Sequence, residues 1–542
     1  MPSCRFLRPL VLLWATVAAQ PLAAQAYDIV IRNGKVLDGM GNPWILADVG
    51  IKAGRSAKVG RITDTGTKEI DATGRFVTPG WIDMMDQSGG VLPRNGLAQN
   101  KVLQGVTTSI GGEGGFPVPA GQIREYFTRL EKQGISMNFG SYYSETQART
   151  AVLGMVARKP SEDEFRRMRA IVDTAMRSGA MGMTTALIYP PSSFATTEEL
   201  IEVAKAIAPY GGTYASHIRG EGKELIESIS EAIRIGEEAK VPVEIFHLKA
   251  AYKPGWGKLM KAAGELIESA RARGIDVAAD LYPYTAGGTG LEATIPSWAF
   301  DGGLDSLRAR LKDPSIRERL KKEVKTGSLG WWNIVEAAGG WKGIVLGAAK
   351  NPANEKYQGM SLEAIAKDMH KDPRDAAWDL VLAGDSRVTA IYHMMSEEDV
   401  KTGLRFPWVS IGSDAGAALN PGVLDATGLP HPRAYGTHPR IIAKYVRDDG
   451  LLTLPEAIRK MTSWPATRMK LAGRGSLKEG NWAAVVVFDF ATIKDESTWE
   501  QPMKSPSGID WVLVNGQIVA DHGQHTGAKP GMVLYGPGTS AP

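Results

Sequence analysis

The chain has 542 residues, more than one hydrophobic core usually supports, and 43% of them are hydrophobic, as in ordinary globular proteins. We therefore expect a large domain with a smaller accessory domain. Lys and Arg number 63 against 59 Asp and Glu, and no dense basic stripe with interleaved aromatic residues occurs, so the sequence predicts no nucleic-acid partner.

Residues 1–26 have the pattern of a secretory signal peptide. Arg5 and Arg8 precede an apolar stretch, residues 10–19, and residues 24–26 (Ala-Gln-Ala) offer a small-residue cleavage site. The apolar stretch is shorter than the about 20 residues that a membrane-spanning helix needs. We therefore expect a secreted or periplasmic protein without a membrane span in its mature form; a retained N-terminal anchor is the alternative. The only cysteine, Cys4, lies in this segment, so the mature chain has no disulfide and no cysteine metal ligand.

Short segments of alternating apolar and polar residues, separated by turn residues, occupy both ends of the mature chain. This pattern is typical of half-buried β-strands. We predict that residues 27–79 and 472–542 together form a small β-sandwich domain. The segments are residues 27–38, 47–52, 57–62, 483–489, 509–520 and 531–535.

Residues 80–471 alternate apolar β-rich runs with helical runs, which indicates parallel strands joined by crossover helices. Eight such units predict a closed (β/α)₈ barrel, so the fold class is α/β. A charged stretch and a Trp-rich segment interrupt the alternation. We expect residues 290–368 to form an insertion beside the mouth of the active site. The expected strands are residues 76–84, 106–110, 180–187, 212–217, 241–247, 275–281, 389–393 and 408–412, with helices at 197–208, 222–239 and 264–273.

Four polar residues close apolar runs, where barrel enzymes place their active sites. They are Glu113, His217, His247 and Asp414. Imidazole and carboxylate groups suit Zn²⁺, which in catalytic sites usually keeps three protein ligands and one open position. Such an ion activates water for attack on an amide carbonyl. Asp414 could then accept the proton of that water and return it to the leaving nitrogen.

Several motifs occur in an order that is hard to produce by chance. Over essentially the whole mature sequence, the chain resembles the N-acyl-D-amino-acid deacylase (D-aminoacylase) branch of the amidohydrolase superfamily. The resemblance implies a (β/α)₈ barrel, a small β-domain and zinc-dependent removal of an acyl group from nitrogen. The motifs include Thr78-Pro-Gly-Trp-Ile-Asp, Gln104-Gly-Val-Thr-Thr, Ser216-His-Ile-Arg-Gly-Glu, Phe246-His-Leu-Lys-Ala-Ala, Tyr282-Pro-Tyr-Thr-Ala and Gly412-Ser-Asp-Ala.

The resemblance also implies roles for individual residues. His217 and His247 match the two histidine ligands of the tighter metal site of the family, and Asp414 matches its strand-8 aspartate, the expected base. The chain departs from the family at the first barrel strand, where Met85 and Gln87 replace a histidine pair. This replacement removes the second metal site.

A second departure concerns the family's cysteine ligand, which aligns with Gly114. The adjacent Glu113 can supply the missing negative ligand. We therefore predict a single ion, zinc or another divalent metal, held by Glu113, His217 and His247. Binding of a second ion would require Gln87, Asp86 or His393 as an additional ligand, and we treat these three as reserve candidates.

The residues that grip the substrate's α-carboxylate in the family are matched by Lys249, Tyr282 and Arg433. A guanidinium fork with an added ammonium suits a carboxylate. Two other interpretations stay open: Lys249 in a local ion pair, and Arg433 paired with a nearby aspartate. A family serine that follows the tyrosine motif is replaced by Gly288.

We thus expect an exported metal-dependent hydrolase of linear amides, which deacylates N-acyl amino acids or short peptides that carry a free carboxylate. The D configuration is implied by the resemblance alone. One alternative is a cyclic-amide hydrolase or dipeptidase of the same superfamily; another is a non-catalytic protein that binds carboxylate ligands. The sequence leaves open the acyl and side-chain specificity, the D or L preference, the native metal and the oligomeric state.

Overall fold

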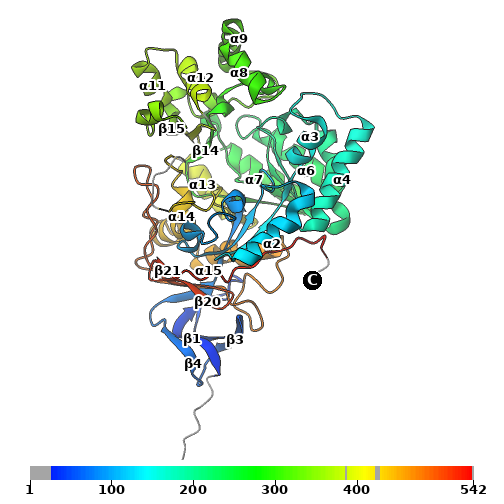
Figure 1. Ribbon diagram of the computed structural model, residues 1–542. Coiled ribbons are helices and arrows are strands. Elements are labelled where there is room, and N and C mark those ends of the chain that lie inside the picture. The colour runs from blue at the N-terminus through cyan, green and yellow to red at the C-terminus, as the bar shows by residue number, and fades with distance from the viewer. Residues whose placement is uncertain (1–25, 385–386, 422–427, 540–542) are drawn as a thin grey trace, which may run out of the picture.

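The computed structural model describes residues 26–384, 387–421 and 428–539 (Figure 1). The expected signal peptide, residues 1–26, therefore lies outside the described residues except for its last position. Among the helices of the described part, none combines the length and apolar character needed to cross a bilayer.

Eight parallel strand positions form a closed barrel. Hydrogen bonds connect β6, β7 and β8 in one run and β9, β10, β11, β12, β13 and β17 in another. A parallel bridge between Asp86 and Ala415, and a hydrogen bond of 2.9 Å from Asp414 N to Met85 O, join β17 to β6. The predicted (β/α)₈ barrel is confirmed. Its strands are β6 (Trp81–Asp86), β7 (Val106–Gly111), β8 (Asn138–Ser141) continued by β9 (Tyr143–Ser144), β10 (Gly182–Ala186), β11 (Thr213–His217), β12 (Val243–Ile245), β13 (Val277–Leu281) and β17 (Val409–Ile411).

Helices surround this barrel, and local sequence explains where they begin and which face they bury. At the start of the longest one, the Ser161 side chain accepts a hydrogen bond from Glu164 N and the Glu164 carboxylate accepts one from Ser161 N, which is a capping box. Gly236 lets another helix approach its strand, because a Cβ there would lie 2.1 Å from Val243 Cγ2. The helices are α1 (Gln99–Val102), α2 (Ile123–Gln133), α3 (Glu145–Leu153), α4 (Glu162–Ser178), α5 (Thr197–Ala204), α6 (Leu225–Ala239), α7 (Leu259–Ala272), α13 (Glu397–Arg405), α14 (Arg433–Arg440), α15 (Leu454–Met461) and α16 (Ser463–Arg468), with a π-helix at Ile441–Asp448.

The insertion departs from the prediction. Residues 389–393 form β16, which lies in a separate antiparallel sheet of order β14-β16-β15, so their assignment to the barrel was wrong. The third barrel strand is instead β8 with β9, whose Asn, Gly and Ser residues carry no strong strand signal. The inserted segment thus runs from β14 to β16, beyond the predicted 290–368, and lies away from the small β-domain (Figure 1). It contains β14 (Ala286–Gly290), α8 (Leu304–Lys312), α9 (Pro314–Thr326), α10 (Ile334–Ala337), β15 (Ile344–Ala348), α11 (Leu362–Asp368), α12 (Pro373–Ala383) and β16 (Thr389–His393).

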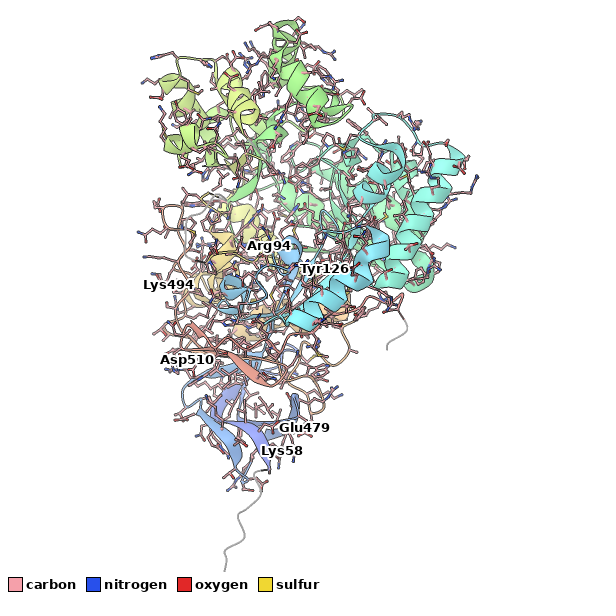
Figure 2. The ribbon with its side chains drawn as sticks, viewed as in Figure 1. Lys58, Arg94, Tyr126, Glu479, Lys494 and Asp510 are labelled. Carbon is pink, nitrogen blue, oxygen red and sulfur yellow. The ribbon has the colours of Figure 1, made fainter. Side chains whose placement is uncertain are left out.

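Strands from both ends of the chain form one nine-stranded sheet with a shared apolar core. Antiparallel pairing of β5 with β18 joins the two ends. Arg75 and Asp510 add an ion pair of 2.6 Å across the junction, and the Glu479 carboxylate accepts a hydrogen bond from Val59 N. Figure 2 shows Asp510 and Glu479 in this part of the molecule. The strands are β1 (Tyr27–Val36), β2 (Ile45–Lys52), β3 (Arg55–Gly60), β4 (Gly66–Asp71), β5 (Phe76–Pro79), β18 (Val485–Phe488), β19 (Ile509–Val514), β20 (Gln517–Asp521) and β21 (Gln524–His525).

The last segment of the chain leaves this sheet. Leu534 N donates to Phe139 O at 2.8 Å, and Gly536 N donates to Gly179 O at 2.9 Å. The prediction that residues 531–535 form a strand of the small domain was therefore wrong, because these residues pack against barrel strand β8 and the end of α4.

Candidate active site

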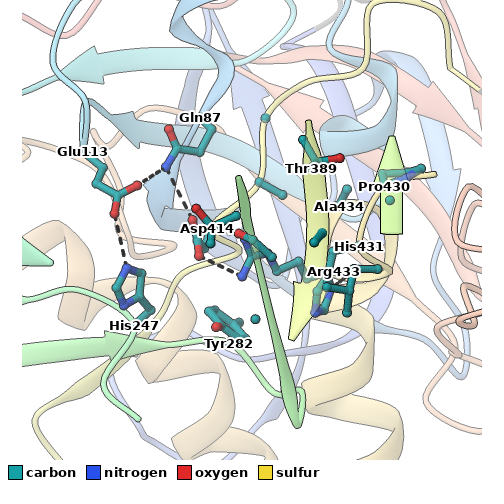
Figure 3. Close-up of a pocket in the computed structure, with 18 of the residues that line it drawn as sticks. Gln87, Glu113, His247, Tyr282, Thr389, Asp414, Pro430, His431, Arg433 and Ala434 are labelled. Atoms are coloured by element: carbon teal, nitrogen blue, oxygen red, sulfur yellow. Dashed lines mark hydrogen bonds and ion pairs between the residues drawn. The ribbon is translucent and has the colours of Figure 1, made fainter. Parts of the chain in front are cut away.

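A cavity of about 630 Å³ lies at the carboxyl ends of the barrel strands. Glu113 follows β7, His217 ends β11, Asp414 follows β17, and His247 follows β12. All four line this cavity, and Figure 3 shows Glu113, His247 and Asp414 around it. The structure thus brings together the four residues that the sequence singles out at strand ends.

The side chains of Glu113, His217 and His247 converge on one point. His217 Nδ1 lies 2.7 Å and His247 Nε2 lies 3.4 Å from Glu113 Oε1. One possible ligand atom from each residue lies within 4.8 Å of the others. The backbone of His247 has a φ of +37°, a left-handed conformation that is unfavourable for histidine. Two imidazole nitrogens and one carboxylate form a donor set that fits a zinc ion.

Charge compensation shapes this cluster. Burial opposes ionisation of Glu113, but the hydrogen bonds with His217 and His247 hold the pKa of its carboxyl well below the ordinary value. Burial and the charge of Lys249 oppose protonation of His247, yet Glu113 and Glu221 raise the pKa of its imidazole to about 9. The two carboxylates therefore favour positive charge at this point, either a proton on His247 or a bound cation.

Glu221 completes the cluster from behind, and the sequence did not single it out as a site residue. Its buried Oε1 lies 3.1 Å from His247 Nδ1 and 3.7 Å from His217 Nε2, and it accepts a hydrogen bond of 2.5 Å from Lys249 Nζ. Burial opposes ionisation, but Lys249 and the two histidines lower the pKa of Glu221. A carboxylate behind a ligating histidine fixes the orientation of its ring. The available signal was its place at the end of the motif that begins at Ser216.

Asp414 lies on the opposite wall. Its Oδ2 is 2.8 Å from Arg433 Nη1, and Gln87 Nε2 lies 3.4 Å from its Oδ1 (Figure 3). The same Gln87 nitrogen donates a hydrogen bond of 2.6 Å to Glu113 Oε2. Asp414 thus reaches the Glu113 carboxylate through one amide group.

The predicted carboxylate clamp is assembled in the cavity, but its cations have protein partners. Lys249 pairs with Glu221, and Arg433 pairs with Asp414, as the alternative interpretations allowed. The buried Tyr282 hydroxyl lacks a hydrogen-bond partner in the described part of the chain, and the Arg433 guanidinium lies 4.6 Å from the Tyr282 ring centre. Gly288, which stands in place of the family serine, has no side chain, and its carbonyl oxygen accepts a hydrogen bond from Arg433 Nη2 at 3.3 Å.

The reserve candidates for a second ion have other partners. Asp86 is fully buried and shares the Lys101 ammonium with Asp83, at 2.9 and 2.6 Å. His393 packs its ring on Trp499, with centres 5.1 Å apart. Within the described residues, Glu113, His217 and His247 form the one group of three or more His, Cys, Asp and Glu residues whose atoms are close enough to hold a metal.

Comparison with known proteins identifies the family. Residues 398–520 match the profile of the Amidohydrolase family. The chain is 33% identical to the D-aminoacylase of Alcaligenes xylosoxydans xylosoxydans over 533 residues, which cover 94% of this chain and 98% of that protein. This chain belongs to the N-acyl-D-amino-acid deacylase branch of the amidohydrolase superfamily. The resemblance that the motifs indicate is thereby confirmed.

Solved structures of this branch show the same overall fold. A D-aminoacylase described as having a binuclear metal centre, with activation by one metal and attenuation by a second, superposes with a TM-score of 0.78 at 32% identity and covers 94% of this chain and 100% of its own. The N-acyl-D-glutamate deacylase of Bordetella bronchiseptica, in complex with zinc and a phosphonate inhibitor that mimics the tetrahedral intermediate, also superposes with a TM-score of 0.78. It is 28% identical and covers 94% of this chain and 99% of its own. The protein is accordingly a metal-dependent amidohydrolase that acts on amide bonds other than ordinary peptide bonds.

Proposed function

We propose that the protein is an exported deacylase that uses one zinc ion to release the acyl group of N-acyl-D-amino acids, or of short peptides that end in a free carboxylate. The convergence of Glu113, His217 and His247 beside Asp414 carries this proposal. The D configuration is supported by the relatives, which act on D-amino-acid derivatives by name.

Glu113, His217 and His247 would hold the zinc ion. A zinc ion bound there would polarise the acyl carbonyl. It would also lower the pKa of water, so that hydroxide is available for attack at neutral pH. Asp414 has the role of the base: its carboxylate accepts a proton from the attacking water and delivers it to the leaving nitrogen. The ion pair with Arg433 holds this carboxylate at the cavity wall.

Lys249, Tyr282 and Arg433 would bind the substrate carboxylate. All three line the cavity, and the Tyr282 hydroxyl is buried without a described hydrogen-bond partner. A buried hydroxyl without a partner carries a free-energy cost, which an incoming carboxylate would remove. This arrangement favours substrates with a carboxylate next to the scissile amide.

The test is metal analysis followed by a substrate screen. The mature protein is purified without a histidine tag, loaded with zinc and assayed with N-acetyl-D-amino acids, their L-enantiomers, and N-acetyl amines that lack the carboxylate. We expect about one zinc per chain and turnover confined to D-substrates with a carboxylate. Turnover of ring amides or dipeptides, with none of the N-acyl-D-amino acids, would refute the substrate assignment.

Export is tested separately. The proposal rests on the basic start, apolar stretch and small-residue site within residues 1–26. Expression of the full chain in a Gram-negative host should give periplasmic protein whose N-terminal residue is Tyr27. An unprocessed N-terminus on protein recovered from the cytoplasm would contradict it.

A further inference from the structure

Gln87 stands between two carboxylates of the site. It follows β6, and its side-chain nitrogen lies 2.6 Å from Glu113 Oε2 and 3.4 Å from Asp414 Oδ1 (Figure 3). We propose that the Gln87 amide takes the place of a second metal ion: it bridges Glu113 and Asp414, orients both and keeps the site mononuclear. This inference rests on the proposed function, because it concerns the same metal site and base.

The chemistry of the amide suits this position. Its nitrogen carries two hydrogens, and each can be donated to a different carboxylate oxygen. Two carboxylates that approach each other repel unless a cation, a shared proton or a hydrogen-bond donor lies between them. In this chain a neutral donor lies there, so no second positive ion is needed to hold Asp414 beside Glu113.

The bridge also decides which oxygen Glu113 presents to the histidines. Oε2 accepts the hydrogen bond from Gln87, whereas Oε1 lies toward His217 and His247. Hydrogen bonds to a ligating carboxylate fix its orientation, and their loss typically lowers metal affinity 10- to 100-fold. Gln87 is therefore a positioning residue for Glu113.

The first strand offers no other ligand for a second ion. The Met85 side chain is buried in an apolar cluster with Ile110 and Phe246. The two carboxylates of the strand, Asp83 and Asp86, are held by the Lys101 ammonium. A second ion could therefore bind Asp414, but β6 would supply no further ligand for it.

The first measurement is zinc titration of the metal-free wild-type protein, with bound metal counted after removal of free ions. We expect one zinc per chain, and no second even at tenfold excess. Two bound ions would overturn the proposal. Absence of any bound zinc would instead refute the proposed function, so the two failures are distinguishable.

The second measurement compares Gln87→Met, which keeps the volume and removes the donor, with Gln133→Ala as control. Gln133 donates one hydrogen bond, to Leu92 O, outside the cavity. We expect the zinc Kd, measured by competition with a chelator, to rise 10- to 100-fold in Gln87→Met and to change less than twofold in the control. An unchanged Kd in Gln87→Met would overturn the proposal.

A kinetic readout separates positioning from a passive role in the cavity wall. At saturating zinc, Gln87→Met should lower kcat about tenfold or more while KM changes less than threefold, because Asp414 Oδ1 loses its donor and only Oδ2 remains held, by Arg433. A rise in KM alone would show that Gln87 only contacts substrate, and would overturn the positioning role. Gln87→His, which restores one family ligand, should let a second zinc bind weakly. If this variant still binds only one zinc ion, the proposal that the amide takes the place of a second metal ion is contradicted.

Discussion

Glu145 offers a test of the wall that supports the site. It begins α3, directly after barrel strand β9, and its Oε2 accepts a hydrogen bond of 3.2 Å from the Ser192 hydroxyl. Ser192 lies on the loop after β10 that also carries Tyr189, a residue of the cavity lining. Glu145 is fully buried, and its Oε1 has no hydrogen-bond partner in the described structure.

The nearby arginine does not neutralise Glu145. Arg149 donates to the Glu199 carboxylate at 2.9 Å and to the backbone carbonyl oxygens of Val156 and Arg158. Burial, followed by the charge of Glu199, raises the pKa of Glu145 to about 8. Glu145 is therefore protonated in the folded protein at neutral pH.

The sign and size of the effect follow from linkage. The folded-state pKa lies above the unfolded value of 4.5, so the stability contribution is complete below pH 4.5 and is lost as the pH rises toward 8. At about 1.4 kcal/mol per pH unit, the loss over this window is at most about 5 kcal/mol. Glu145→Gln removes the titration, because the amide stays neutral at every pH.

The assay is urea unfolding of Glu145→Gln and wild type at pH 5, 6, 7 and 8, with the exposed Glu227→Gln as control. At pH 5 the variant should be equal to wild type or about 1 kcal/mol less stable, because its amide N–H₂ enters a site built for a carboxyl. At pH 8 it should be more stable by several kcal/mol. A difference that does not change between pH 5 and 8 would refute the reasoning. A pH dependence found in Glu199→Gln instead would place the proton on Glu199.

Two further predictions concern the site, and a third concerns the buried ion pairs of Lys101. Asp414→Asn should lower kcat about 10²- to 10⁴-fold without loss of bound zinc, as steady-state kinetics and metal analysis would show. Glu221→Gln should raise the zinc Kd about 10- to 100-fold, because His247 Nδ1 loses its carboxylate partner. An unchanged Kd in a chelator competition would contradict this. Lys101→Met should destabilise the fold by about 3–5 kcal/mol in urea unfolding, because Asp83 and Asp86 would remain buried without their cation; a cost below about 1 kcal/mol would contradict it.

The barrel, and which residues meet in its cavity, could be predicted from the sequence for a physical reason. Strands buried on both faces appear as apolar runs, and polar residues that end such runs stand out, as His217, His247 and Asp414 do. The strand at residues 138–144 escaped notice because its small polar residues are buried by packing between neighbours, which pattern alone does not reveal. Residues 389–393 have a strand pattern, but no local feature of the sequence indicates which sheet they join.

Pairing between charged groups was less predictable, because it depends on which strand ends meet. Nothing in the separate motifs shows that Arg433 pairs with Asp414 or that Lys249 pairs with Glu221. For Arg433, the structure agrees with the alternative interpretation that it pairs with a nearby aspartate. Lys249 and Arg433, the residues of the proposed clamp, line the cavity with these pairs in place.

The charges of the site agree with the proposed binding of one divalent ion. Glu113, Glu221 and Asp414 contribute three negative charges, and Lys249 and Arg433 contribute two positive charges. Without metal, the raised pKa of His247 supplies the missing proton and balances the cluster. With one divalent ion and neutral histidines the site carries one positive charge, which a substrate carboxylate cancels. A second divalent ion would leave a larger positive excess in the cavity. The neutral Gln87 amide between Glu113 and Asp414 agrees with this balance, whereas a second ion there would disturb it.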